Sequence, residues 1–115
     1  MTEPRLKTVE IKAFVPARDF AQSIAFYEAL GFTCASVFGG VAYFHCGNSS
    51  FLLQDFCVQA HADNDQMHLL VEDVEAWYSR ARPVAERFKV KIGEPTDQPW
   101  AMRDFTLFDP SGVLW

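Results

Sequence analysis

The sequence predicts an α+β fold in which one strand–helix–three-strand unit is written twice. Residues 8–15 alternate between apolar and polar side chains, as a half-buried strand does, and an amphipathic helix follows them. A second strand-like run, 66–71, is followed by another helix, and the apolar positions of the two helices stand at matching offsets from Asp19 and Asp73. We therefore expect a single domain over 1–115, with module one at about 8–56, a linker at 57–65 and module two at about 66–115.

Module one opens on the alternating strand 8–15. One face of this strand carries Val9, Ile11, Ala13 and Val15, and the other carries Glu10, Lys12 and Phe14. The next helix starts at Asp19, a typical capping residue, with Gln22 three positions later for the reciprocal bond, and Gly31 ends it. Its apolar stripe consists of Phe20, Ile24, Tyr27 and Leu30. Three strands are expected to follow, at 32–38, 41–46 and 50–56, with hairpin turns at 39–40 and 47–50.

Module two repeats this plan after the polar stretch "CVQAHADND". Its first strand is expected at 66–71, and Asp73 caps a helix whose apolar positions are Val74, Tyr78, Ala81 and Val84. Pro83 lacks a backbone N–H, so it predicts a kink or a split of this helix near Arg82. Strands at 89–93 and 103–109, a turn at "DPSG" and a last strand from Val113 complete the expected order.

The composition is that of a globular chain and excludes several classes of partner. Half of the 115 residues are apolar and 22% are charged, which is typical of folded domains. The net charge of -5 and the lack of a basic run argue against nucleic acid. No apolar run reaches the roughly 18 residues of a membrane span, and the polar start "MTEPRLKT" is unlike a signal peptide. The three cysteines, Cys34, Cys46 and Cys57, fit no metal spacing and are interpreted as reduced thiols of a cytoplasmic protein.

Three stretches together resemble a known family: "FVPARDFAQSIAFYEALGF", "HLLVEDVEAWY" and "RDFTLFDPSGVLW". They resemble the two units of the vicinal oxygen chelate superfamily, whose members include glyoxalase I, extradiol dioxygenases and bleomycin-resistance proteins. The resemblance runs from about residue 8 to residue 115. It implies the glyoxalase/bleomycin-resistance fold, in which two βαβββ modules form a curved mixed sheet with the helices outside. It also implies a homodimer whose modules pair into a cup that holds the ligand.

The resemblance also indicates where a divalent metal would be bound. Superfamily enzymes place a His, or sometimes a Gln, early in the first strand of each module, and these positions correspond to Glu10 and Gln66. The other ligand of each module is normally a Glu on the fourth strand, and in module one that position falls near Leu52. Glu10 and Gln66 are therefore weak metal candidates, with His68 on the same face as Gln66. We expect no cofactor and no catalytic residue in this chain.

Aromatic residues are the main candidates for contact with a ligand. The chain holds 11 Phe, and aromatic walls suit flat heterocycles. Trp100 follows Pro99 on an expected loop, and Arg103 could grip a carboxylate or phosphate, or stack on an aromatic ring. The candidate ligand-binding residues are Lys12, Phe14, Phe38, Phe44, His68, Trp100, Arg103 and Phe105.

These observations favour a metal-free small-molecule-binding protein of the bleomycin-resistance type. Such a protein sequesters an aromatic or cationic compound in a cup lined by aromatic side chains, without turning it over, and antibiotic resistance is the matching role. The alternative is a metal-dependent lyase or dioxygenase of the glyoxalase superfamily with a degenerate metal site. A third reading is an interaction module whose cup is filled by its own side chains. The expected partners are a second copy of the chain and a small-molecule ligand, with no nucleic acid and no membrane.

Overall fold

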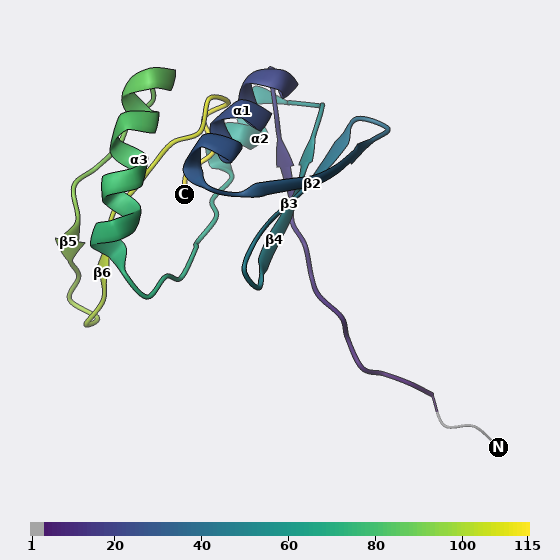
Figure 1. Cartoon of the computed structure of the whole chain (residues 1–115), viewed down its shortest axis with the longest axis horizontal. Coiled ribbons are helices and arrows are strands. Elements are labelled where there is room, and N and C mark those ends of the chain that lie inside the picture. Colours follow the sequence, from purple (N-terminus) through teal and green to yellow (C-terminus); the bar gives the residue numbers. More distant parts are fainter. Residues whose placement is uncertain (1–3) are drawn as a thin grey trace.

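A computed structural model describes residues 4–115 as a mixed α+β fold (Figure 1). A four-stranded sheet lies on one side, a long helix and a two-stranded ribbon lie on the other, and two helices lie between them. The elements are β1 (Phe14–Pro16), α1 (Phe20–Leu30), β2 (Thr33–Phe38), β3 (Val41–Cys46), β4 (Ser49–Gln54), α2 (Gln59–Asn64), α3 (Val74–Phe88), β5 (Thr96–Asp97) and β6 (Arg103–Asp104). The predicted α+β class is confirmed.

Helix α1 forms where its local signals predict it. The side chain of Asp19 accepts a hydrogen bond from the backbone N–H of Gln22 at 3.1 Å, which caps the first turn. The helix ends at Gly31, whose φ of 107° is a left-handed conformation that glycine adopts without steric cost. Tyr27 and Leu30 of the expected stripe are buried, so the helix packs through the face that the sequence indicates.

The main sheet has the strand order β1-β4-β3-β2. β1 runs parallel to β4, whereas the pairs β4–β3 and β3–β2 are antiparallel, so the sheet is mixed. Val15, Phe44 and Leu53 are buried on the face that packs into the core. We call the opposite side the outer face, and it carries Phe14, Phe38, Val41, Tyr43, His45, Ser50, Leu52 and Gln54.

The first strand is much shorter than predicted. β1 covers only Phe14–Pro16, and the chain ahead of it runs away from the sheet (Figure 1). Phe14 pairs with Leu52 in the parallel pair β1–β4. Three residues earlier on both segments, Ile11 is level with Ser49, the first residue of β4. Residues before Ile11 therefore lie beyond the end of the neighbouring strand. Val9 and Ile11, which we expected on a buried face, are 96% and 95% exposed.

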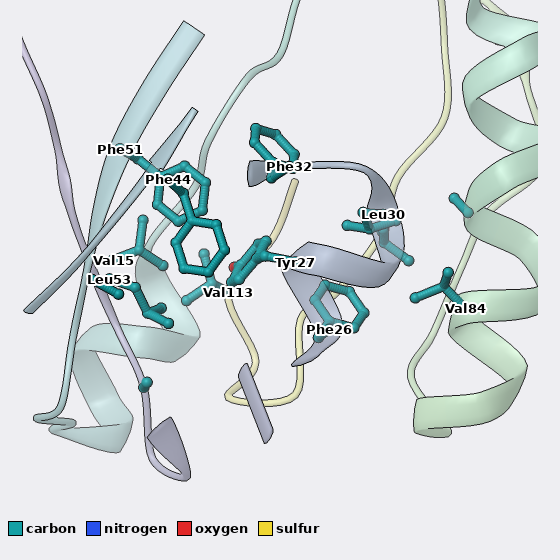
Figure 2. Close-up of a cluster of buried hydrophobic side chains, with 14 of the residues drawn as sticks. Val15, Phe26, Tyr27, Leu30, Phe32, Phe44, Phe51, Leu53, Val84 and Val113 are labelled. Atoms are coloured by element: carbon teal, nitrogen blue, oxygen red, sulfur yellow. The ribbon is translucent and has the colours of Figure 1, made fainter. Parts of the chain in front are cut away.

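The core is built around aromatic rings that α1 and the sheet contribute (Figure 2). The Tyr27 ring lies 4.8 Å from that of Phe51 and 5.7 Å from that of Trp115, measured between centroids and at steep angles. Phe44 and Phe51 stack nearly parallel at 5.3 Å. These contacts extend from the first half of the chain to its last residue, so the two halves share one core.

The expected linker 57–65 contains a helix, α2. Ala62 is fully buried, and the Gln59 amide donates to the carbonyl oxygen of Ser111 at 2.9 Å. The Gln59 side chain also accepts a hydrogen bond from Arg18 at 2.9 Å. The linker expected at 57–65 thus holds a short helix, and a buried alanine and a bridging glutamine anchor this polar segment to both halves.

Helix α3 is continuous, although Pro83 predicted a kink or a split near Arg82. Asp73 caps it by accepting a hydrogen bond from the N–H of Ala76 at 3.0 Å, and the helix continues unbroken to Phe88. Pro83 and Ser79, whose carbonyl group would have bonded to position 83, are both exposed, so water can satisfy that carbonyl. The helix therefore passes the proline without dividing.

The strands of the second half are less complete than predicted. The run 66–71 contributes one parallel bridge, between Gln66 and Leu114, and the run 89–93 contributes one antiparallel bridge, between Ile92 and Leu107. Regular pairing appears instead in the short ribbon β5–β6. Among residues 4–115, none of the helices has the length and apolar character that crossing a membrane requires.

Candidate ligand-binding face

Two of the predicted ligand-contacting phenylalanines lie exposed on the outer face of the main sheet. Phe14 in β1 is 56% exposed, and Phe38 at the end of β2 is 89% exposed. Large apolar side chains that gather on one surface indicate contact with another molecule. The structure therefore presents both side chains where a ligand could reach them.

A polar cluster lies at the edge of this face, around the carboxylate of Glu10. Glu10 forms an ion pair with Lys12 and accepts hydrogen bonds from Ser50 at 2.7 Å and from Tyr43 at 3.2 Å. The Lys12 ammonium lies 4.9 Å from the centre of the Tyr43 ring, a cation–π contact. The Lys12 ammonium and the Ser50 hydroxyl hold the pKa of Glu10 below its ordinary value, and Glu10 raises the pKa of Lys12. Both groups are therefore charged at neutral pH.

The residues at the predicted metal position do not fit a divalent cation. The Glu10 carboxylate already pairs with Lys12, so a metal ion would have to displace an ammonium group. Leu52, at the position of the fourth-strand ligand, is apolar and pairs with Phe14 in the sheet. Within the described part of the chain, no three or more His, Cys, Asp or Glu side chains are grouped as metal ligands. The second candidate, Gln66, is exposed, and its recorded bridge is to Leu114.

Phe44 does not belong to this face. Its side chain is fully buried and stacks on Phe51 beneath the sheet. The register of β3 places Tyr43 and His45 outward, so Phe44 between them points toward α1. The prediction that Phe44 contacts a ligand is corrected: it is a core residue.

Arg103 and Phe105 face helix α3 rather than the outer face. The Arg103 guanidinium donates to Glu75 at 2.6 Å and to Asp97 at 3.1 Å, and these two carboxylates raise its pKa. The Phe105 ring packs edge-on against the Tyr78 ring of α3, with centroids 5.3 Å apart. Both side chains therefore have partners within the chain, Arg103 two carboxylates and Phe105 the Tyr78 ring.

His68 and Trp100 are accessible but lie away from the main sheet. His68 is exposed on the unpaired run after Gln66. Trp100 is 63% exposed in the loop between β5 and β6. The next residue, Ala101, has a φ of 64°, a strained value for a residue with a side chain, so this loop makes a tight turn beside the tryptophan. One chain therefore does not bring these residues together with Phe14 and Phe38.

A cavity of about 390 Å³ lies in the second half of the chain. Its walls include Leu69, Trp77 and Leu107, which also pack against the core cluster or belong to it. Of the predicted ligand-binding residues, its lining includes His68, Arg103 and Phe105. The cavity thus opens between α3 and the strands that α3 covers, on the core side of the second half.

The polar partners of Glu10 were missed by the sequence analysis. Tyr43 and Ser50 meet Glu10 because β3, β4 and the segment ahead of β1 lie side by side. The alternation in "VAYFHC" places Tyr43 opposite to Phe44, and this signal was present in the sequence. The meeting with Glu10 depends on the register between strands, which no local pattern gives.

The fold is similar to those of solved bleomycin-binding proteins. The bleomycin resistance determinant encoded on transposon Tn5 is 23% identical over 93% of each chain, with a TM-score of 0.77. A bleomycin-binding protein from Streptomyces verticillus, solved with copper(II)-bleomycin, is 20% identical over 96% of this chain and 94% of that chain, with a TM-score of 0.79. Lactoylglutathione lyase from Agrobacterium tumefaciens is 18% identical over 94% of this chain and 91% of that chain, with a TM-score of 0.66. At these identities the likeness shows the fold alone.

The family can be assigned from the sequence match. No curated protein matches the chain. The family model of the Glyoxalase/Bleomycin resistance protein/Dioxygenase superfamily matches residues 7–115, which include all three stretches on which the resemblance was based. The chain belongs to the Glyoxalase/Bleomycin resistance protein/Dioxygenase superfamily.

Proposed function

We propose that this protein binds and sequesters an aromatic or cationic small molecule on the outer face of its main sheet, without a metal. The observation that carries the proposal is the exposure of Phe14 and Phe38 on the same sheet face, on its two edge strands, with the Glu10 and Tyr43 cluster at the β1 end of that face. Aromatic side chains supply flat contact area for a heterocycle, and a few polar groups orient it.

A cationic group on the ligand suits the Tyr43 ring, which already holds the Lys12 ammonium in a cation–π contact. The Glu10 charge is neutralised by its ion pair with Lys12, so a ligand amine would have to take the place of this ammonium. The net charge of -5 adds a weak attraction in the same direction. A ligand with a flat ring system and an amine would engage both parts of the face.

We further propose that two copies of the chain complete the binding site as a homodimer. Phe14 and Lys12 lie with the main sheet, whereas Gln66 and His68 are exposed on the run 66–71 of the second half. A second copy can place its 66–71 run against the first copy's outer face, which gives the cup a second wall. The three free cysteines accord with a reducing compartment, and we place this dimer in the cytoplasm with antibiotic resistance as its role.

The similar structures support binding as the first candidate. Two of them are described as a bleomycin-binding protein in complex with bleomycin or copper(II)-bleomycin. Another is a lactoylglutathione lyase, so a metal-dependent lyase is the alternative that the experiment must distinguish from binding. The poor fit of Glu10 and Leu52 to a metal favours the binding reading.

Thermal unfolding in the presence of bleomycin tests the proposal. A ligand at about 100 times its dissociation constant adds nearly 3 kcal/mol to the free energy of unfolding, so the transition should move upward by several degrees. Phe38→Ala should remove most of this shift. The matched control is Val58→Ala, which truncates an exposed apolar side chain outside the main sheet.

Separate thermal unfolding measurements with Ni²⁺, Mn²⁺ and Zn²⁺ distinguish the metal-dependent enzyme from a metal-free binding protein. A stabilisation by metal that EDTA reverses, together with no response to bleomycin, would contradict the proposal and favour the lyase. An equal response of both variants to bleomycin would move the binding site away from the outer face.

A further inference from the structure

Three side chains form a continuous row across the outer face. Phe14 of β1 and Tyr43 of β3 both pair with Leu52 of β4, one on each side of it. Neighbouring strands lie about 4.8 Å apart, so the backbones that carry the two aromatic rings are about 10 Å from each other. Leu52 is half-buried between them. The row is therefore a floor on which a small fused-ring heterocycle can lie.

One end of this floor is occupied by a cation that the chain itself supplies. The ammonium of Lys12 lies 4.9 Å from the centre of the Tyr43 ring and forms an ion pair with Glu10. Glu10 in turn accepts hydrogen bonds from the hydroxyl groups of Ser50, at 2.7 Å, and of Tyr43, at 3.2 Å. A carboxylate held by two hydroxyl groups beside an aromatic ring suits an organic cation, and Lys12 fills this place.

Lys12 is held there only by groups that a ligand would also use. Within residues 4–115, its ammonium interacts with no charged or aromatic group other than Glu10 and Tyr43. Lys12 lies two positions ahead of β1, which is an edge strand of the main sheet. Its flexible four-carbon stem can therefore turn past the sheet edge into water when another cation takes its place.

An exchange of cations favours a ligand whose charge is weakly hydrated. The lysine ammonium is compact and strongly hydrated, so it regains a large hydration free energy when it leaves Glu10 for water. A ring cation with delocalised charge gives up less hydration on entering, and it presents a flat face to Tyr43. A compact primary ammonium on the ligand has no such advantage over Lys12.

We propose that Lys12 is a built-in competitor for a cation subsite formed by Glu10 and Tyr43, and that it selects flat ligands with a delocalised positive charge over primary amines. The inference rests on the proposed ligand binding and assigns one subsite within it. A cationic ligand binds at this subsite only by displacing Lys12. Removal of the Lys12 ammonium therefore strengthens the binding of such a ligand.

Lys12→Met tests the proposal, because methionine keeps an unbranched apolar stem and removes the ammonium. The matched control is Lys7→Met, which makes the same substitution at an exposed lysine of the same segment and changes the net charge equally. One probe is N-methylquinolinium, a flat cation with delocalised charge. The other is naphthylmethylammonium, which carries a primary ammonium on a ring system of the same size. Titration followed by NMR at the amides of Tyr43 and Ser50 gives the dissociation constants.

Lys12→Met should bind N-methylquinolinium about tenfold more tightly than the wild type, because no ion pair and no cation–π contact has to be broken first. The wild type should bind naphthylmethylammonium more weakly than N-methylquinolinium, and Lys7→Met should bind both probes as the wild type does. Equal affinity of Lys12→Met and the wild type for N-methylquinolinium, or no response at Tyr43 in either protein, would overturn the proposal. An equal gain in Lys7→Met would also overturn it, since net charge alone would then explain the effect.

A failure of the proposed sequestration gives a different result from a failure of the competitor. If bleomycin leaves thermal unfolding unchanged while Lys12→Met gains affinity for N-methylquinolinium, the cation subsite stands and bleomycin is not its ligand. If bleomycin stabilises the wild type while Lys12→Met gains no affinity for either probe, the outer face binds its ligand without displacing Lys12, and the competitor is excluded.

Discussion

Tyr27 joins the two halves of the chain through its hydroxyl group. It donates a hydrogen bond of 2.5 Å to the carboxylate of Asp109 and accepts one of 2.9 Å from the indole N–H of Trp115. The other oxygen of Asp109 accepts from the N–H groups of Ser111 and Val113, which closes the "DPSG" turn. Burial raises the pKa of Asp109, although the hydrogen bonds from Tyr27 and these N–H groups act to lower it.

Tyr27→Phe should therefore destabilise the protein and change its pH dependence. The loss leaves a carboxylate oxygen and an indole N–H without their partner, at a cost of about 1–3 kcal/mol. It also removes a hydrogen bond that lowers the pKa of Asp109, so this pKa should rise further. An acid whose pKa is raised in the folded state loses stability as the pH rises through that value, and regains it as the pH falls toward its ordinary pKa of 3.8. In Tyr27→Phe this pH-dependent loss of stability should therefore extend to higher pH than in the wild type.

Urea unfolding over a series of pH values measures both effects. The control is Tyr78→Phe, because the Tyr78 hydroxyl has no hydrogen-bond partner recorded among residues 4–115 while its ring packs on Phe105. If Tyr27→Phe and Tyr78→Phe unfold alike at every pH, the buried network contributes nothing and this account of Asp109 is wrong.

At the level of single residues, the sequence could place some site side chains and not others. Alternation along a strand separates Tyr43 from Phe44, but it does not say which of the two faces the core. That choice depends on α1 covering one side of the sheet, where Phe44 meets Phe51. Arg103 and Phe105, two positions apart, share a face by the same alternation, but the position of α3 decides that both contact this helix.

At the level of elements, the helices α1 and α3 were predicted well because their signals are local, whereas α2, which has no side-chain cap, was not predicted. Asp19 and Asp73 cap α1 and α3 through the hydrogen bonds that their positions indicate. The first strand was predicted poorly, because an alternating run becomes a strand only where a neighbour exists. β4 begins at Ser49, level with Ile11, so residues before Ile11 have no strand beside them whatever their own pattern.

Pro83 is the position in α3 that local rules describe as unfavourable. It lies inside the helix, lacks the N–H that would bond to Ser79, and is exposed, so its side chain contributes little packing. Pro83→Ala should raise the free energy of unfolding by about 1–3 kcal/mol, since a proline costs about 3 kcal/mol in a helix interior and its rigidity returns part of that in the unfolded chain. Urea unfolding measures the change. The matched control is Arg82→Ala at the neighbouring exposed position, which should change the free energy of unfolding little. If Pro83→Ala instead lowers the free energy of unfolding, the proline is needed for the shape of α3.

At the level of the whole molecule, two unpartnered features remain in one chain. The segment ahead of β1 extends from the body and exposes Leu6, Val9 and Ile11 (Figure 1). The outer face exposes Phe14, where this segment enters the sheet, and Phe38 on the opposite edge strand β2. The apolar surface along this segment and this sheet face is where the proposed second copy would pack. The sequence could indicate this only through the resemblance, because its alternation had assigned Val9 and Ile11 to the core.

The homodimer can be tested on this segment by sedimentation of the double variant Val9→Asp, Ile11→Asp. Two carboxylates at an apolar interface would be desolvated without partners, so the dimer dissociation constant should rise by about a hundredfold or more. Thr8→Asp adds a charge to a neighbouring exposed position and should have a much smaller effect.

If two copies share the cup, the double variant should also lose its thermal shift with bleomycin. Its unfolding in buffer at low protein concentration should stay close to that of the wild type. A wild type that sediments at 13.1 kDa at every concentration, or a double variant that dimerises as well as Thr8→Asp, would contradict the dimer and leave the outer face to bind its ligand alone.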